Sequence, residues 1–297
     1  MDKNKTWLEV ALNGGWGKAI QPGIPVSVRD IVEQAVACVR AGAAIVHLYA
    51  YDEQTARQKD DAELYVRLIG EIRSRADAIV YPTIPFAGLP GHPSAQSAQA
   101  RFAHVEELAK RGLLEWAAVD PGSTNFAHYD DLRQDKLGFV YLNPEEHVRH
   151  GLDLARRYRF HPAYAIYEPG FLRLGATLHW RCSSPLPIYR FMFSSGFTFG
   201  FPPDDYGLTA YLNLLDQVAP GSPWMVGGLA VDVLSMIPRA VAEGGHVRVG
   251  LEDAPLGSER TNVEWVEQAR ARIENAGGEL ASAEEIRAAL RAVEMGD

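Results

Sequence analysis

The sequence predicts an α/β protein folded as a single (β/α)8 TIM barrel with an extra C-terminal helix. Short runs rich in Val, Ile, Leu, Tyr and Phe recur roughly every 30 to 40 residues, each followed by a stretch with helical apolar spacing. Several runs are apolar almost throughout, as strands buried on both faces of a parallel sheet are. Eight such units are typical of a closed barrel, so we expect one domain over residues 1–297.

The eight expected strands follow one another along the whole chain. They cover residues 7–13, 44–51, 78–84, 115–120, 163–167, 188–194, 224–229 and 246–252. The alternative architecture is an open doubly wound sheet. It is disfavoured because no G-x-G-x-x-G follows the first strand and because eight parallel units more often close into a barrel.

The expected helices show recognisable ends. The first, 28–41, begins after Ser27, a good N-cap residue, and ends at Gly42, a common stop signal. Further helices are predicted over 60–75, 95–111, 144–158, 170–181 and 262–275. A final amphipathic segment, 282–293, opens with the capping-box pattern Ser282-x-x-Glu285, and we expect it to pack across the outside of the barrel.

Composition excludes several classes of protein. The chain is 47% hydrophobic, and its 29 Lys and Arg against 38 Asp and Glu give a net charge of −9, which disfavours a nucleic-acid partner. No stretch is apolar enough to cross a membrane, and no signal segment is recognisable, so we expect a cytoplasmic protein. The two cysteines, Cys38 and Cys182, form neither a disulfide framework nor a zinc motif.

In such a barrel the active site lies at the C-terminal ends of the strands. Residues two apart share a strand face, so His47 lies with Tyr49, and Arg248 with Glu252. The second and eighth strands both flank the first, which predicts that His47 and Glu252 approach each other near Asn13. An imidazole and a carboxylate are ligands that zinc accepts. The alternative is a core histidine beside a structural ion pair between Glu252 and Arg248.

Other strand ends offer groups that bind anions. Gly227 and Gly228 precede a helix expected near Val231, where barrels often bind phosphate on backbone N–H groups. Thr83 and Ser123 supply hydroxyl groups suited to a substrate carboxylate. A simple tight turn remains the alternative at Gly227-Gly228 and at Asp120-Pro121-Gly122-Ser123.

Five segments together resemble the β-keto acid cleavage enzymes, which include 3-keto-5-aminohexanoate cleavage enzyme. They are ALNGG at 11–15, AGAAIVHL at 41–48, GSTNF at 122–126, YE at 167–168 and GGHVRVGLED at 244–253. The resemblance runs nearly end to end and is most specific in the last segment. It implies a (β/α)8 barrel that condenses a β-keto acid with acetyl-CoA, giving acetoacetate and a CoA ester, on a divalent metal, usually zinc.

The resemblance also implies roles for individual residues. His47 and Glu252 match metal ligands of the family, whereas Tyr49 stands where the family has its second metal-binding histidine. Because a phenol has a pKa near 10, metal affinity is expected to fall or the metal to be absent. Asp253 matches the family's general base, and Arg248 the arginine that supports the reacting groups.

The remaining candidates concern the substrate. Thr83 and Ser123 match hydroxyl positions near the substrate carboxylate, and Trp16 stands where the amine-specific member has a glutamate that pairs with an ammonium group. A cationic substrate is therefore not expected, and an apolar or aromatic side chain is favoured. The full set of expected substrate contacts is Asn13, Trp16, Tyr49, Thr83, Ser123, Gly227 and Gly228.

Three functions remain open at this point. The first is the β-keto acid cleavage that the resemblance implies, in a homodimer or homotetramer. The second is a metal-free retro-aldol or lyase reaction with Tyr49 as acid or base. The third is a barrel that only binds a small acid, since fold alone does not fix function.

Overall fold

A computed structural model describes residues 5–86 and 97–295 of the chain. Eight parallel strands form one sheet in the order β5-β2-β1-β12-β11-β10-β9-β6. Its ends, β5 and β6, also lie against each other, so the sheet curves into the predicted barrel. The strands are β1 (Leu8–Ala11), β2 (Ile45–Leu48), β5 (Ile79–Pro82), β6 (Trp116–Ala118), β9 (His161–Ile166), β10 (Ile188–Phe193), β11 (Trp224–Gly228) and β12 (His246–Val249).

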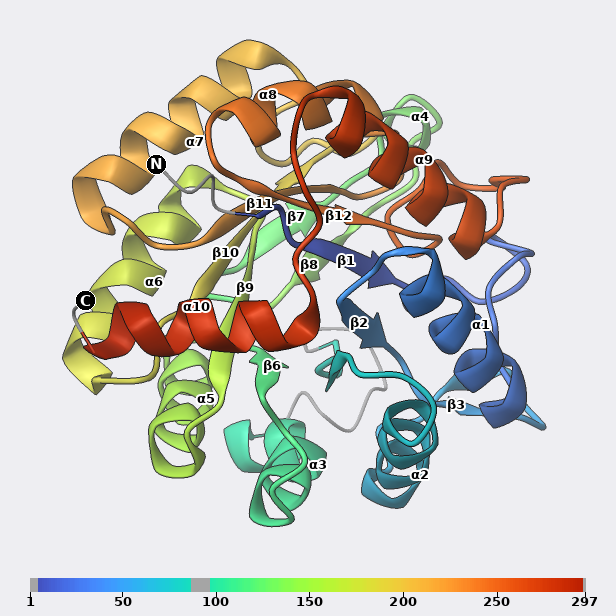
Figure 1. Cartoon of the computed structure of the whole chain (residues 1–297). Coiled ribbons are helices and arrows are strands. Elements are labelled where there is room, and N and C mark those ends of the chain that lie inside the picture. The colour runs from blue at the N-terminus through green and yellow to red at the C-terminus, as the bar shows by residue number, and fades with distance from the viewer. Residues whose placement is uncertain (1–4, 87–96, 296–297) are drawn as a thin grey trace.

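Helices surround this barrel, as Figure 1 shows. They are α1 (Val28–Ala41), α2 (Ala62–Arg73), α3 (Ala98–Lys110), α5 (Glu145–Tyr158), α6 (Pro169–Cys182), α7 (Asp205–Val218), α8 (Ile237–Ala242) and α9 (Asn262–Asn275). Ser27 caps α1 by accepting a hydrogen bond from the Asp30 amide, and Gly42 ends it with φ 128°, as predicted. Among the described helices, none combines the length and apolar character needed to cross a bilayer.

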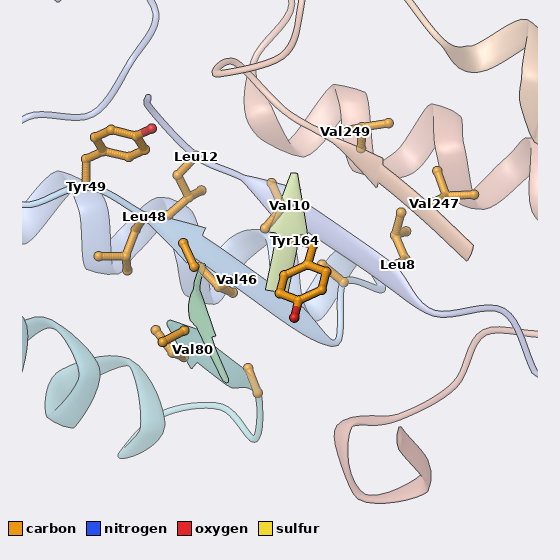
Figure 2. Close-up of a cluster of buried hydrophobic side chains, with 14 of the residues drawn as sticks. Leu8, Val10, Leu12, Val46, Leu48, Tyr49, Val80, Tyr164, Val247 and Val249 are labelled. Carbon is orange, nitrogen blue, oxygen red and sulfur yellow. The ribbon is translucent and has the colours of Figure 1, made fainter. Parts of the chain in front are cut away.

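The two faces of each strand have different neighbours. Leu8, Val10 and Val247 pack in the large apolar cluster between the strands and the helices, part of which Figure 2 shows. Glu9 and Arg248, the alternate residues of the neighbouring strands β1 and β12, lie opposite each other in register and bond to each other inside the barrel. This alternation, which follows from the pleat of a strand, collects polar side chains inside the barrel.

The C-terminal helix α10 (Ala283–Met295) packs across the outside of the barrel, as expected, and it does so at one end. Its Ile286 and Leu290 pack with Trp7, Trp116 and Met225 at the N-terminal ends of the strands. Figure 1 shows α10, in red, crossing this end of the barrel. The expected capping box is present, because Ser282 and Glu285 exchange hydrogen bonds. The helix therefore closes the end opposite the candidate site.

Several elements were not anticipated from the sequence. They are α7, the short helix α4 (Tyr129–Leu132), and two hairpins, β3 (Tyr51–Asp52) with β4 (Arg57–Gln58) and β7 (Thr124–Phe126) with β8 (Phe139–Tyr141). The helix expected near Val231 begins later, with a 3₁₀ turn at Leu234–Met236 followed by α8. Residues 95 and 96, predicted as the start of a helix, lie outside the described residues.

Gly250, just after β12, should tolerate no side chain. Its φ is 134°, and a Cβ there would lie 2.2 Å from the Ala11 carbonyl oxygen. Gly250→Ala is therefore expected to lower the free energy of unfolding by about 2–4 kcal/mol in urea titrations. Gly170→Ala is the control, because a Cβ at Gly170 in α6 would meet nothing within 4 Å apart from the backbone of its own helix. The control should be neutral or slightly stabilising, and equal losses in both variants would contradict the explanation.

Candidate active site

The predicted approach of His47 and Glu252 is confirmed by the structure. His47 lies in β2, Glu252 follows β12, and the His47 Nε2 atom lies 3.6 Å from Glu252 Oε2. Tyr49 shares this position, because its hydroxyl donates a 2.9 Å hydrogen bond to Glu252 Oε1. All three side chains are buried. Position 49 thus supplies a hydrogen-bond donor to the same carboxylate that His47 approaches.

Arg248 is held from three sides by carboxylates. Its Nε and one terminal nitrogen each donate to Asp253 at 2.8 Å, which makes a bidentate pair. Its other terminal nitrogen donates to Glu9 Oε1 at 2.8 Å, and Glu252 Oε2 lies 3.2 Å from the guanidinium. Arg248 is 2% exposed. A guanidinium fixed by so many partners is preorganised to stabilise negative charge that develops beside it.

Burial shifts the protonation of this group of side chains. It lowers the pKa of His47 well below its usual value, and the charges of Arg248 and Arg190 lower it further, so the imidazole is neutral at pH 7. Burial and the nearby Glu252 charge raise the pKa of Tyr49, which keeps its phenol protonated. Burial also raises the pKa of Glu252 to about 7, although Arg248 opposes the shift.

A second polar network crosses the barrel interior from Glu9. Tyr81 donates a 2.6 Å hydrogen bond to the Glu9 oxygen that also accepts from Arg248. Arg190 of β10 donates to the Tyr81 oxygen at 3.1 Å and lies 3.4 Å from Asp120 Oδ1. Tyr141 donates to the other Asp120 oxygen at 2.5 Å. The site is therefore one end of a chain of paired charges through the barrel.

This second network was not predicted from the sequence. Its members are Glu9, Tyr81, Arg190, Asp120 and Tyr141. Two of them were recognisable, because Glu9 and Arg190 are the charged residues within strands that are otherwise apolar. A buried charge in such a strand requires a partner, and that requirement was the available signal.

Asn13 and Trp16 position the groups around Glu252. The Asn13 amide donates to the backbone oxygens of Pro25 and Tyr49 and accepts from the Tyr49 amide, so its polar atoms tie the segments after β1 and β2 together. The Trp16 indole donates a 2.8 Å hydrogen bond to the Glu252 backbone oxygen. Gly14 beside them has no room for a side chain, since a Cβ would lie 2.7 Å from Glu252 Cγ.

The threonine, serine and glycine residues expected to bind substrate lie at different distances from the Glu252 and Arg248 side chains. Thr83 is buried next to Tyr49, whose phenol it contacts. Ser123 follows β6, across the ring from β12, and accepts a 2.8 Å hydrogen bond from the Asn143 amide. Gly227 is close to Arg248, whereas Gly228 packs against Val231 and Val233. Thr83 and Gly227 therefore lie near the Tyr49, Glu252 and Arg248 side chains. Ser123 lies on the opposite side of the barrel.

Aromatic residues from several strand ends gather beside the polar cluster. Trp16 stacks on Phe197 with ring centroids 6.1 Å apart, and Phe126 contacts both Phe197 and Tyr167. The aromatic cluster comprises Phe126, Tyr141, Phe197, Phe199 and Leu229, with Trp16, Phe86, Phe139, Tyr167 and Ala230 packed against it. Trp16 links this cluster directly to Glu252.

The residues present do not fit a catalytic zinc site. Such a site takes three protein ligands, and here His47 and Glu252 supply two, while the Tyr49 phenol directs its proton at Glu252. The neighbouring Asp253 and Glu9 carboxylates are bound by Arg248. Within residues 5–86 and 97–295, no three His, Cys, Asp or Glu side chains are grouped so that they could hold a metal ion.

A family model described as beta-keto acid cleavage enzyme matches residues 5–291. Two characterised relatives match over most of their lengths. The 3-dehydrocarnitine:acetyl-CoA trimethylamine transferase of Rhizobium meliloti (strain 1021) is 26% identical over 90% of each chain. The 3-oxoadipate:acetyl-CoA acetyltransferase of Cupriavidus necator (strain H16) is 25% identical over 95% of this chain and 93% of the relative.

Solved structures share the fold at low sequence identity. The apo structure of ObcA superposes with a TM-score of 0.70 at 16% identity, over 91% of this chain and 65% of that one, so the present chain spans about two thirds of its length. A type I 3-dehydroquinate dehydratase from Clostridium difficile superposes with a TM-score of 0.57 at 10% identity, over 93% of each chain. These likenesses concern the barrel alone.

Proposed function

Because the chain belongs to the beta-keto acid cleavage enzyme family and is an enzyme that acts on β-keto acids, we propose that it uses acetyl-CoA as co-substrate and a β-keto acid whose side chain is not cationic. The products are acetoacetate and the CoA ester of the shortened acid. Relatives named for acetyl-CoA-dependent transfers support this proposal. The observation that carries it is the buried Arg248, fixed by Asp253 and beside Glu252, in the segment that most resembles the family.

The reaction needs a base and a stabilised oxyanion. In the proposed sequence Asp253 accepts a proton from the carbon between the two carbonyl groups of the β-keto acid. Each Asp253 oxygen already accepts from Arg248, but a carboxylate oxygen has a second lone pair that can accept the proton. Arg248 stabilises the negative charge that develops on the substrate oxygen.

Carbon–carbon bonds then form and break in turn. The enolate carbon attacks the thioester carbon of acetyl-CoA and releases the CoA thiolate. The thiolate attacks the original keto carbon, and the bond from that carbon to the former enolate carbon breaks. The bonding electrons remain on the acetoacetate fragment, which takes back the proton from Asp253. One acyl group has then been exchanged for another without net oxidation.

We propose that the substrate side chain is apolar or aromatic. Trp16 and Phe197 form an aromatic wall that begins at Glu252, and the cluster behind it is aromatic and aliphatic. Burying a charged group against such a wall without a partner is costly. The wall therefore favours an uncharged side chain and disfavours the amino and trimethylamine groups that appear in the names of several relatives.

Replacing Trp16 should change which substrates are used. Trp16→Ala is expected to lower kcat/KM for a phenyl-substituted β-keto acid roughly tenfold or more, and to change it less for a methyl-substituted one, because the lost contacts are apolar. Trp180→Ala is the matched control, since Trp180 is 79% exposed on α6. Equal losses for both substrates in Trp16→Ala would contradict this assignment.

The proposed activity is tested with a panel of β-keto acids that carry apolar, cationic or anionic side chains. Each acid is incubated with acetyl-CoA, and the new CoA ester is identified by mass spectrometry. We expect product with apolar side chains that requires both substrates and the protein. If no acid yields a CoA ester, the proposal fails and a barrel that only binds a small acid is favoured. Light scattering tests the expected homodimer or homotetramer.

A further inference from the structure

The side chain at position 49 is the feature that separates this site from a metal site. His47 and Tyr49 have ring centroids 5.5 Å apart, and both are directed at Glu252. Three donors would converge on one point if position 49 carried a metal ligand. Instead, the Tyr49 hydroxyl donates a 2.9 Å hydrogen bond to Glu252 Oε1.

The second Glu252 oxygen accepts no hydrogen bond, but it lies in an ion pair with a guanidinium. Glu252 Oε2 lies 3.2 Å from a terminal nitrogen of Arg248, besides the 3.6 Å approach of His47. Tyr49 thus bonds to one oxygen of the carboxylate that a metal would need, and Arg248 forms an ion pair with the other. The backbone of Tyr49 is in turn fixed by the Asn13 amide, so the phenol is held in this position.

We propose that Tyr49 replaces a metal ligand, so that Glu252 is held by the hydrogen bond from Tyr49 and the ion pair with Arg248, and the native protein does not retain zinc. A single substitution, Tyr49→His, then completes a three-ligand site with His47 and Glu252. An imidazole is shorter than a phenol, which leaves space for a cation between position 49 and Glu252. Asn13 would hold the backbone of the new histidine as it holds that of Tyr49.

The size of the effect follows from the number of ligands. Loss of a group that merely supports a zinc ligand lowers zinc affinity by about 10- to 100-fold, and a missing ligand costs at least as much. Tyr49→His is therefore expected to raise zinc affinity by about 100-fold or more over the native protein. Tyr49→Phe removes the hydrogen bond without adding a ligand, so it should bind zinc no better than the native protein does.

The test measures zinc content on full-length protein without a histidine tag. Native protein, Tyr49→His, Tyr49→Phe and the double variant Tyr49→His/Glu252→Gln are loaded with zinc, dialysed against a chelator, and analysed for zinc per chain. We expect about one zinc per chain in Tyr49→His alone. Loss of that zinc in the double variant would show that the ion is bound at Glu252. Cobalt-substituted protein gives an absorption spectrum as a second readout.

Two outcomes would overturn the proposal. One is native protein that keeps one zinc per chain through dialysis, since the two protein ligands would then suffice. The other is Tyr49→His that folds as the native protein does, by circular dichroism, yet gains no zinc. Should Tyr49→His not fold, Tyr49→Cys supplies a thiolate ligand for the same comparison. Zinc content is read without turnover, so the result is independent of the proposed reaction.

Discussion

Arg248→Met is expected to abolish formation of the CoA ester and to lower the free energy of unfolding by about 3–5 kcal/mol. The substitution keeps an unbranched side chain but removes the positive charge that pairs with Asp253 and Glu9 inside the barrel. Those carboxylates would remain buried without their partner, which accounts for the stability loss. Turnover falls because no fixed charge then faces the developing oxyanion.

Two comparisons separate the loss of charge from general damage. Arg248→Lys retains a positive charge but loses the bidentate geometry, so it should be more stable than Arg248→Met and still nearly inactive. Arg133→Met is the surface control, because Arg133 forms an exposed pair with Asp130, and such pairs contribute little. Urea unfolding and turnover are measured for each variant. If Arg248→Met had the same free energy of unfolding as the native protein, the stabilising role of Arg248 among the buried carboxylates would be contradicted.

Asp253→Asn is expected to lower kcat by roughly 10²- to 10⁴-fold, the usual contribution of a positioned general base. The amide has nearly the shape of the carboxylate, but it cannot accept the proton that the reaction removes. It also turns an N–H toward Arg248 where the native oxygen accepts a hydrogen bond. Circular dichroism should therefore show a folded barrel with a modest loss of stability.

Asp130→Asn is the matched control for this variant, since it removes the surface carboxylate that pairs with Arg133. It should leave kcat and stability within error of the native values. Unchanged kcat in well-folded Asp253→Asn would remove Asp253 from the mechanism. The base would then have to be sought among the other carboxylates of the site, Glu252 first, whose Oε2 accepts no hydrogen bond.

The barrel and the position of its site could be predicted because both depend on local patterns. Apolar runs at a regular spacing specify strands, and helix caps such as Ser27 and Gly42 specify helix ends. Two residues on one strand share a face, so the approach of His47 to Glu252 required only that the second and eighth strands flank the first. The structure confirms that approach.

The second polar network could not be predicted, because its hydrogen bonds join residues that are far apart in the sequence. Glu9 bonds to Arg248, and Arg190 to Tyr81, only once the strands have met in their final register. Likewise, the 282–293 segment was recognisable as an amphipathic helix, but nothing local indicates that it closes the N-terminal end of the barrel. Its position becomes clear from the contacts of Ile286 and Leu290.

The family resemblance identified Tyr49 as the residue that stands where the family has a metal-binding histidine. It could not show that the phenol bonds to Glu252 Oε1 while Arg248 lies against Oε2. Those contacts depend on rotamers and on the bonds that fix the Tyr49 backbone to Asn13. These contacts hold Glu252 in a specific arrangement in which position 49 supplies a hydrogen-bond donor and no metal ligand.

Exchange of acyl groups between a β-keto acid and acetyl-CoA is best tested by following labelled carbon. Native protein is incubated with a β-keto acid that has an apolar side chain and with acetyl-CoA that carries ¹³C in both acetyl carbons. We expect both labels in acetoacetate, in the methyl and keto carbons, and no label in the new CoA ester. Cleavage of the β-keto acid without acetyl-CoA, or label in the new CoA ester, would contradict this expectation.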